Sequence, residues 1–201
     1  MGRKKNYDRD DLIRKSVEIF RDNGFAGTSA EMLVKGLGVN RYSIYAEFGS
    51  KQGLFDAALE RYDMEVVDRN FGPLEAPGAG LDEIRALLQF FGSVDGNPGL
   101  GRGCLLCNTA VEFGPDDPSG AGFVQSYFAR LSNAFRTALE NALAGGELHE
   151  AVDVKEEAGF FTASVLGLFV MLRAKAPSPT IESAARVAIE HLKGLRSVPS
   201  V

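Results

Sequence analysis

The sequence lacks tryptophan and has only two cysteines and two histidines among its 201 residues. Two cysteines cannot build a disulfide framework, and the two histidines lie at spacings from them that do not suit a zinc site, so no metal is expected. No apolar run reaches the roughly 18 residues that a membrane-spanning helix needs. The N-terminus leads into charge and not into the apolar stretch of a signal peptide. We therefore expect a cytoplasmic protein without a cofactor and without a membrane partner.

The motifs of the common enzyme classes are also missing. The chain has no P-loop and no Gly-x-Ser-x-Gly elbow. The glycines Gly99, Gly101 and Gly103 have the wrong spacing for a dinucleotide fingerprint, and no predicted strand precedes them. Two isolated histidines on unrelated segments provide no convincing general base. We therefore expect a protein that is not an enzyme.

Charge is distributed unevenly along the chain, whose net charge is -5. Residues 1–51 hold 10 Lys and Arg against 7 Asp and Glu, whereas residues 52–201 hold 12 against 20. A basic segment on an acidic remainder favours a polyanion as the partner of the first segment only.

Apolar residues recur at helical spacing throughout, and strand-like alternation is absent, so the sequence predicts an all-α fold of about nine helices. Asn23-Gly24 ends the first helix, and Gly38-Val39 makes a tight turn. Residues 70–80, rich in glycine and proline, are expected to be a loop. The predicted helices span about 10–23, 28–37, 40–48, 51–66, 81–94, 104–113, 119–144, 154–175 and 180–195.

The first three helices form a pattern typical of a helix-turn-helix. Thr28 and Glu31 have the spacing of a capping box, and Asn40 is suited to cap the third helix. A helix that enters the major groove must be exposed and polar at its start, as residues 40–43 are.

The run from Thr28 to Phe55 resembles the DNA-binding domain of the TetR family of bacterial transcriptional regulators. The matching pieces are Gly24-Phe25, the turn Gly38-Val39, Ile44-Tyr45, Phe48-Gly49-Ser50-Lys51 and Gly53-Leu54-Phe55. The resemblance covers residues 8–60 and implies a three-helix DNA-binding head over residues 1–50. Residues 51–201 would then form a ligand-binding and dimerisation domain. The sequence departs from the family pattern at Gly36, Tyr42, Ala46 and Glu47.

The resemblance also implies which side chains meet double-stranded operator DNA. Arg41, Tyr42 and Ser43 are expected to read base edges, with Arg41 suited to a guanine, although Tyr42 has backbone contact as an equal alternative. The other residues of the set below are expected to cap helices or to contact phosphates. The alternatives for them are capping alone, packing in the core, or simple exposure on the surface. The DNA-binding set is Thr28, Ser29, Asn40, Arg41, Tyr42, Ser43, Tyr45 and Lys51.

Two further features of the head have open interpretations. Glu47 either points away from the DNA or accepts a hydrogen bond from a cytosine amino group. Arg3, Lys4 and Lys5 either reach a groove or the DNA backbone, or form a solvated tail.

The helix that enters the major groove, here the one predicted at 40–48, covers only one half-site of an operator. A homodimer is therefore expected on a palindromic operator. Small residues at helical spacing form a ridge on the helix predicted at 154–175, and the last helix adds a second stripe; by resemblance, these helices form a four-helix bundle across a twofold axis. An intra-chain core helix is the alternative. The predicted interface residues are Ala163, Gly167, Val170, Ala174, Ala184, Ala188 and His191.

The segments between head and interface are expected to enclose a pocket for an unknown small-molecule effector, with a plain core as the alternative. The candidate lining residues are Phe90, Phe91, Cys104, Cys107, Asn108, Val111, Phe123, Tyr127 and Phe161. Cys104 and Cys107 are expected to be buried structural thiols. A pocket contact and a redox or electrophile sensor remain alternatives.

The sequence therefore predicts a transcriptional repressor that a small molecule releases from its operator. Activation and cysteine-based sensing remain the alternatives.

Overall fold

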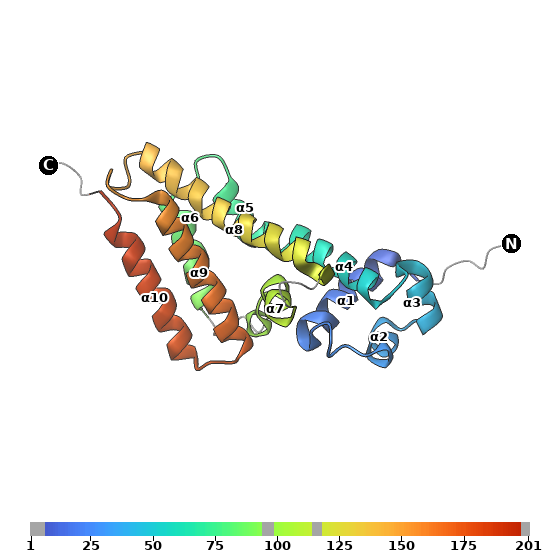
Figure 1. The fold of residues 1–201 in the computed structure, drawn as a ribbon. Helices are drawn as coiled ribbons and strands as arrows, with labels where there is room; N and C mark the ends of the chain where they lie inside the picture. The colour runs from blue at the N-terminus through green and yellow to red at the C-terminus, as the bar shows by residue number, and fades with distance from the viewer. Residues whose placement is uncertain (1–6, 94–98, 114–117, 198–201) are drawn as a thin grey trace. The chain divides into compact units, whose positions relative to one another are not determined.

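The structure is a computed structural model that describes residues 7–93, 99–113 and 118–197. These residues form ten α-helices, one π-helical turn and one 3-10 turn (Figure 1). The helices are α1 (Arg9–Asn23), α2 (Ala30–Leu37), α3 (Arg41–Phe48), α4 (Lys51–Tyr62), α5 (Asp68–Glu75), α6 (Leu81–Gly92), α7 (Leu105–Glu112), α8 (Pro118–Ala144), α9 (Val154–Arg173) and α10 (Ser178–Gly194).

The all-α fold class is confirmed, and a helix lies at each of the nine predicted positions. The predicted loop over residues 70–80 is wrong in its first half, because α5 occupies it. A π-helical turn, Asp63–Val67, joins α4 to α5, and Pro73 lies inside α5. Phe71 and Leu74 of α5 are fully buried, so tertiary packing outweighs the local preference of glycine and proline for a loop.

The chain divides into two compact units. The first comprises residues 1–66 and 104–124, and the second comprises residues 67–103 and 125–201. Helix α7 therefore belongs with the N-terminal helices, which the sequence did not indicate. The predicted division after residue 50 stays a prediction.

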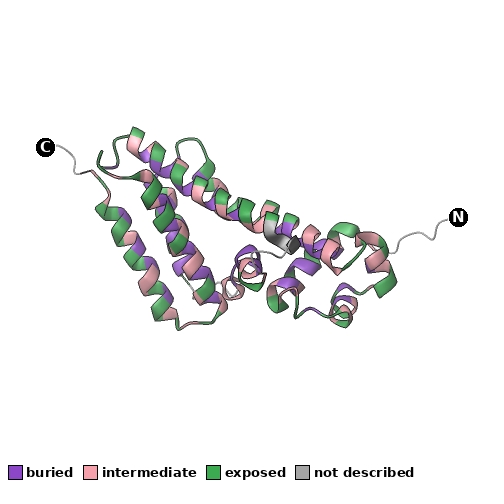
Figure 2. Cartoon of the chain, viewed as in Figure 1, coloured by how far each residue is buried: buried purple, intermediate pink, exposed green. Residues whose placement is uncertain are grey.

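In the first unit, α1 packs against α2, α4 and α7. Its buried stripe contains Leu12, Ile13, Val17 and Phe20, which recur at the spacing of one helix face. The ring of Phe20 meets the edge of Phe55 on α4, with centroids 4.9 Å apart. Figure 2 shows these inward faces as buried and the opposite faces as exposed.

In the second unit, α6 packs against α5, α9 and α10. Aromatic rings fill its core: Phe91 contacts Phe71 and Phe169, and Phe135 contacts Phe71 and Phe161. Edge and offset ring pairs of this kind contribute beyond the area that they bury. This unit therefore has a packed aromatic core of its own.

Candidate nucleic-acid interface

Helices α2 and α3 are joined by a short turn whose caps are well defined. Gly38 ends α2 with a left-handed φ of 70°, a conformation that costs glycine little. Asn40 then caps α3 by accepting a 2.8 Å hydrogen bond from the Ser43 amide, which confirms the predicted cap. The pair forms the predicted helix-turn-helix.

The capping box predicted at the start of α2 is wrong by one residue. Ser29 is the cap, and its hydroxyl accepts from the Met32 amide at 3.2 Å. Thr28 is buried and donates its hydroxyl to the Gly24 carbonyl at 2.5 Å, so it closes the preceding loop instead. Glu31 lies in the first turn, where hydrogen bonds from its own amide and from Ser29 lower its carboxyl pKa.

Helix α3 buries one of its residues, whereas the other seven are exposed or partly exposed. Ile44 is buried, whereas Tyr42 is 83% exposed. The guanidinium carbon of Arg41 lies 5.2 Å from the ring centroid of Tyr45, one turn along the helix. The structure thus brings Arg41, Tyr42, Ser43 and Tyr45 together at the start of α3.

Lys51 lies at the start of α4, where Ser50 caps the helix by accepting from the Gly53 amide. Its ammonium nitrogen lies 4.3 Å from the ring centroid of Phe25, which belongs to the loop between α1 and α2. A lysine at a helix N-terminus adds its charge to the positive end of the helix dipole, and both favour an anion such as phosphate.

Glu47 on α3 is engaged within the protein. Its carboxylate accepts from the Tyr7 hydroxyl at 3.3 Å and lies 3.5 Å from Arg9 Nε, and its side chain is 9% exposed. These contacts favour the interpretation in which Glu47 points away from DNA. Tyr7 and Arg9, which the sequence did not single out, anchor the start of the described chain to α3. Arg3, Lys4 and Lys5 lie outside the described residues.

The candidate effector residues fall in both units. Cys104, Cys107, Asn108, Val111 and Phe123 belong to the first unit, and Phe90, Phe91, Tyr127 and Phe161 to the second. Within the first unit, the two cysteines are buried, whereas Val111 is 77% exposed.

In the second unit, Phe91 and Phe161 are part of the aromatic core, and Tyr127 is also buried. Phe90 is exposed and lines a groove between α5 and α6 with Leu74 and Leu87. The role of these residues in binding an effector stays a prediction.

The two cysteines lie at the start of α7. Cys104 is the residue before the helix, and Cys107 lies one turn into it. Burial, followed by the nearby Cys104, raises the pKa of the Cys107 thiol to about 12. Burial also raises the pKa of Tyr62, which lies beside Cys104. These surroundings favour a protonated Cys107 thiol over a reactive thiolate.

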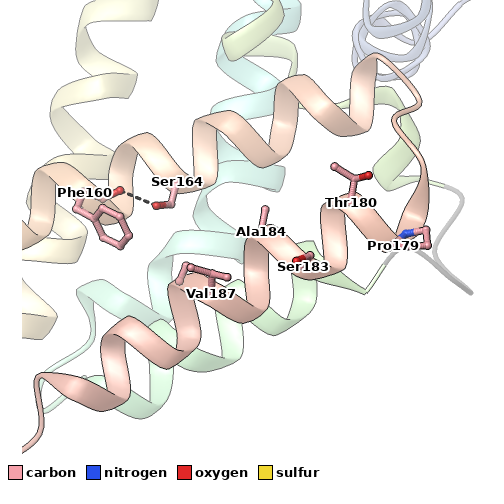
Figure 3. A pocket seen from close by; sticks show the side chains of 8 residues that line it. Phe160, Ser164, Pro179, Thr180, Ser183, Ala184 and Val187 are labelled. Carbon is pink, nitrogen blue, oxygen red and sulfur yellow. Dashed lines mark hydrogen bonds between the residues drawn. The ribbon is translucent and has the colours of Figure 1, made fainter.

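An apolar groove lies on α9 and α10 (Figure 3). The exposed side chains of Phe160 and Val187 line it together with Ala184. Of the other predicted interface residues, Ala163, Val170 and Ala174 are exposed and Gly167 is partly exposed, but Ala188 is buried within the protomer. His191 is exposed, and its Nε2 lies 2.7 Å from Glu157 Oε2. The predicted ridge on α9 therefore lies on the protomer surface, and Ala188 on α10 lines the groove although it is largely buried.

The described residues contain neither a candidate metal site nor a candidate membrane span. No group of three or more His, Cys, Asp or Glu side chains in residues 7–93, 99–113 and 118–197 could hold a metal ion. No helix in the same ranges is long and apolar enough to cross a membrane.

Comparison with family models gives two matches. Residues 12–58 match the family described as bacterial regulatory proteins, tetR family, and residues 80–188 match the tetracyclin repressor-like C-terminal domain. The chain belongs to the TetR family. It is therefore related to transcriptional regulators that carry a helix-turn-helix, and the residues of the DNA-binding motif lie inside the first match.

Two curated relatives are similar to this chain over most of its length. The HTH-type transcriptional regulator YezE of Bacillus subtilis (strain 168) is 30% identical over 197 residues, which cover 96% of this chain and 100% of YezE. The HTH-type transcriptional repressor ComR of Escherichia coli (strain K12) is 30% identical and covers 86% of this chain and 82% of its own.

The fold is similar to that of solved TetR-family structures. The TetR-family regulator CifR, as a cysteine variant complexed with 26-base-pair operator DNA, has a TM-score of 0.82 at 24% identity. The match covers 94% of this chain and 98% of that one. A TetR regulator from Chloroflexus aurantiacus has a TM-score of 0.80 at 25% identity and covers 94% and 95% of the two chains.

Proposed function

We propose that this TetR-family regulator acts as a homodimeric repressor, which binds a palindromic operator and is released from it by a small molecule. The observation that carries the DNA-binding part is the exposed start of α3, where Arg41, Tyr42 and Tyr45 project from a helix held by buried Ile44. The repressor ComR, which is similar over most of the chain, supports repression over activation.

In this proposal α3 enters the major groove. Arg41 pairs with a guanine, since its planar fork matches the two acceptors of that base. Ser43 and Tyr42 contact neighbouring bases or the backbone. Lys51, Ser29 and Tyr45 contact phosphates and set the register of the head on the duplex. Thr28, whose hydroxyl is bound to Gly24, supports the loop that precedes α2.

The proposed dimer forms through α9 and α10. Phe160, Val170 and Val187 are 40%, 50% and 57% exposed. Apolar side chains that are exposed together on two adjacent helices are typical of a surface that a partner protein covers. Small residues between them, such as Ala163 and Gly167, let a second pair of helices approach closely. Two protomers related by a twofold axis would present two α3 helices to the two half-sites.

The proposed response to an effector is a shift between two conformations of the dimer, of which one fits the operator. A ligand shifts such an equilibrium only by its difference in affinity for the two forms. The raised pKa of Cys107 argues against a reaction at that thiol as the signal. The protein acts in this way in the cytoplasm, without catalysis.

The test begins with selection of bound sequences from a pool of random DNA duplexes. We expect a palindrome with two equivalent half-sites. The dissociation constant for that duplex should lie about 10³-fold or more below that for a scrambled duplex at equal salt, as for other specific complexes. Equal affinity for selected and scrambled duplexes would contradict the proposal. Small molecules that weaken binding to the selected duplex then identify the effector.

A further inference from the structure

The last residue of α7 is bound to the loop between α1 and α2, within the first unit. The carboxylate of Glu112 accepts from two consecutive backbone amides: Phe25 N–H to Oε2 at 2.8 Å and Ala26 N–H to Oε1 at 2.5 Å. Both carboxylate oxygens are thus engaged by residues that lie 86 and 87 positions away in the sequence. Hydrogen bonds to an ionised acceptor are stronger than those between neutral groups.

The loop is shaped to receive this carboxylate. Gly24 has a φ of 71°, and a Cβ atom added there would lie 2.8 Å from Glu112 Oε2. Only glycine combines this backbone conformation with room for the carboxylate. The Gly24 carbonyl in turn accepts the hydroxyl of Thr28, the residue directly before the Ser29 cap of α2. The contact therefore continues along the loop to the start of α2.

The same loop supports Lys51. The ring of Phe25 packs against Phe55 and Phe113, with centroid separations of 5.0 and 5.5 Å. Lys51 lies over that ring. The backbone amide of Phe25 is held by Glu112, so one carboxylate fixes the residue on which the lysine rests.

We propose that Glu112 is a positioning residue for DNA binding. Its carboxylate holds the loop between α1 and α2 so that the start of α2 and the Lys51 ammonium face the phosphate backbone together. This inference rests on the proposed function, because it assigns those two groups to the DNA. The role belongs to α7, a helix remote in sequence from the helix-turn-helix.

The negative charge of Glu112 lets one substitution distinguish a positioning role from simple electrostatic repulsion. Removal of a negative charge from a DNA-binding unit by itself strengthens DNA binding, because less repulsion opposes the phosphates. Loss of a positioning contact has the opposite effect. Glu112→Gln keeps the length of the side chain, but its amide NH₂ cannot accept from the second backbone amide.

We expect Glu112→Gln to raise the dissociation constant for the selected duplex about tenfold. Hydrogen exchange at the Phe25 and Ala26 amides should accelerate. Glu112→Asp keeps the charge but shortens the reach, so we expect a loss of affinity at unchanged net charge. Glu140→Gln, which removes an exposed carboxylate on α8 that lies 3.7 Å from Arg136, is the matched control and should bind as the parent does.

The outcomes separate this inference from the proposed function. A parent that selects no duplex contradicts the proposed function itself. A parent that binds, with Glu112→Gln and Glu112→Asp binding as tightly or more tightly, overturns the positioning role alone. Urea unfolding of each variant monitors the fold. If Glu112→Gln does not fold, Glu112→Asp decides the question by the same measurements.

Discussion

Arg41 lies across the ring of Tyr45, with its guanidinium carbon 5.2 Å from the ring centroid. A cation–π contact of this kind at an exposed site stabilises by about 0.5–1 kcal/mol. Tyr45 therefore restricts the orientation of Arg41 before DNA is bound. The two residues should act together, as a base-reading side chain and its support.

The first prediction concerns this pair. Arg41→Ala should weaken operator binding by about 1–3 kcal/mol and relax the preference at one base position, because the bidentate contact is lost. Tyr45→Phe keeps the ring under Arg41 but removes the hydroxyl, so it should weaken all duplexes equally. Binding titrations with duplexes substituted at each position distinguish the two effects. Arg136→Ala, which removes an exposed arginine of α8, is the control for charge.

The second prediction concerns Lys51. Lys51→Ala should weaken selected and scrambled duplexes to the same extent, since phosphate contacts carry no sequence information. The slope of log affinity against log salt should fall by about one per half-site. Titrations at several salt concentrations provide the slope. A variant with the slope of the parent would place Lys51 away from the DNA backbone.

The third prediction concerns assembly. Gly167→Trp should yield monomers, because the indole fills the ridge that a partner helix must approach. No side chain lies within 4 Å of a Cβ atom added at Gly167, so the substitution should leave the protomer folded. Sedimentation velocity measures the change in mass. Ala129→Trp, at an exposed position of α8, should stay dimeric. A parent that sediments as a monomer at micromolar concentration would refute the dimer.

The fourth prediction concerns Cys107, whose thiol pKa is about 12 in the folded protein. At pH 8 its thiolate fraction is about 10³-fold below that of an ordinary cysteine. The greater nucleophilicity of a high-pKa thiolate restores part of this factor. We expect iodoacetamide to modify Cys107 at least about 50-fold more slowly in folded than in urea-unfolded protein. Peptide mass spectrometry over time measures both rates, and equal rates would revive the sensor hypothesis.

The same pKa predicts a loss of stability at high pH. Below the ordinary thiol pKa of 9.0, Cys107 is protonated in both the folded and the unfolded chain. As the pH rises from 9 toward 12, the unfolded chain releases its proton first, so the free energy of unfolding decreases. Cys107→Ala should reduce this decrease in urea titrations at pH 8 and pH 10.

Sequence reasoning located the helix-turn-helix because its signals are local. Asn40 and Gly38 act on neighbouring atoms, so their spacing alone predicts the cap and the turn. The sequence does not indicate that Ser29, and not Thr28, caps α2, because both residue types can cap a helix. The choice depends on the buried Thr28 hydroxyl and its bond to Gly24.

The remaining differences arise from contacts between distant residues. Helix α5 forms in spite of Pro73 because Phe71 and Leu74 are buried against other helices. Glu112 gave no local signal, since its partners lie more than 80 positions earlier. The burial of Ala188 likewise depends on which face of α10 packs against the rest of its unit, and helical spacing alone does not determine that choice.

The composition of the first unit has a consequence for anyone who wishes to exchange DNA specificity between members of this family. A graft that ends after α4 would carry the reader helix but omit residues 104–124, and with them Glu112 and Phe113. The transplanted loop around Phe25 would then face the α7 helix of the recipient protein, which need not carry a carboxylate or an aromatic ring at the matching positions. A functional exchange therefore requires two separate pieces of chain, the N-terminal helices and the α7 segment, moved as a pair.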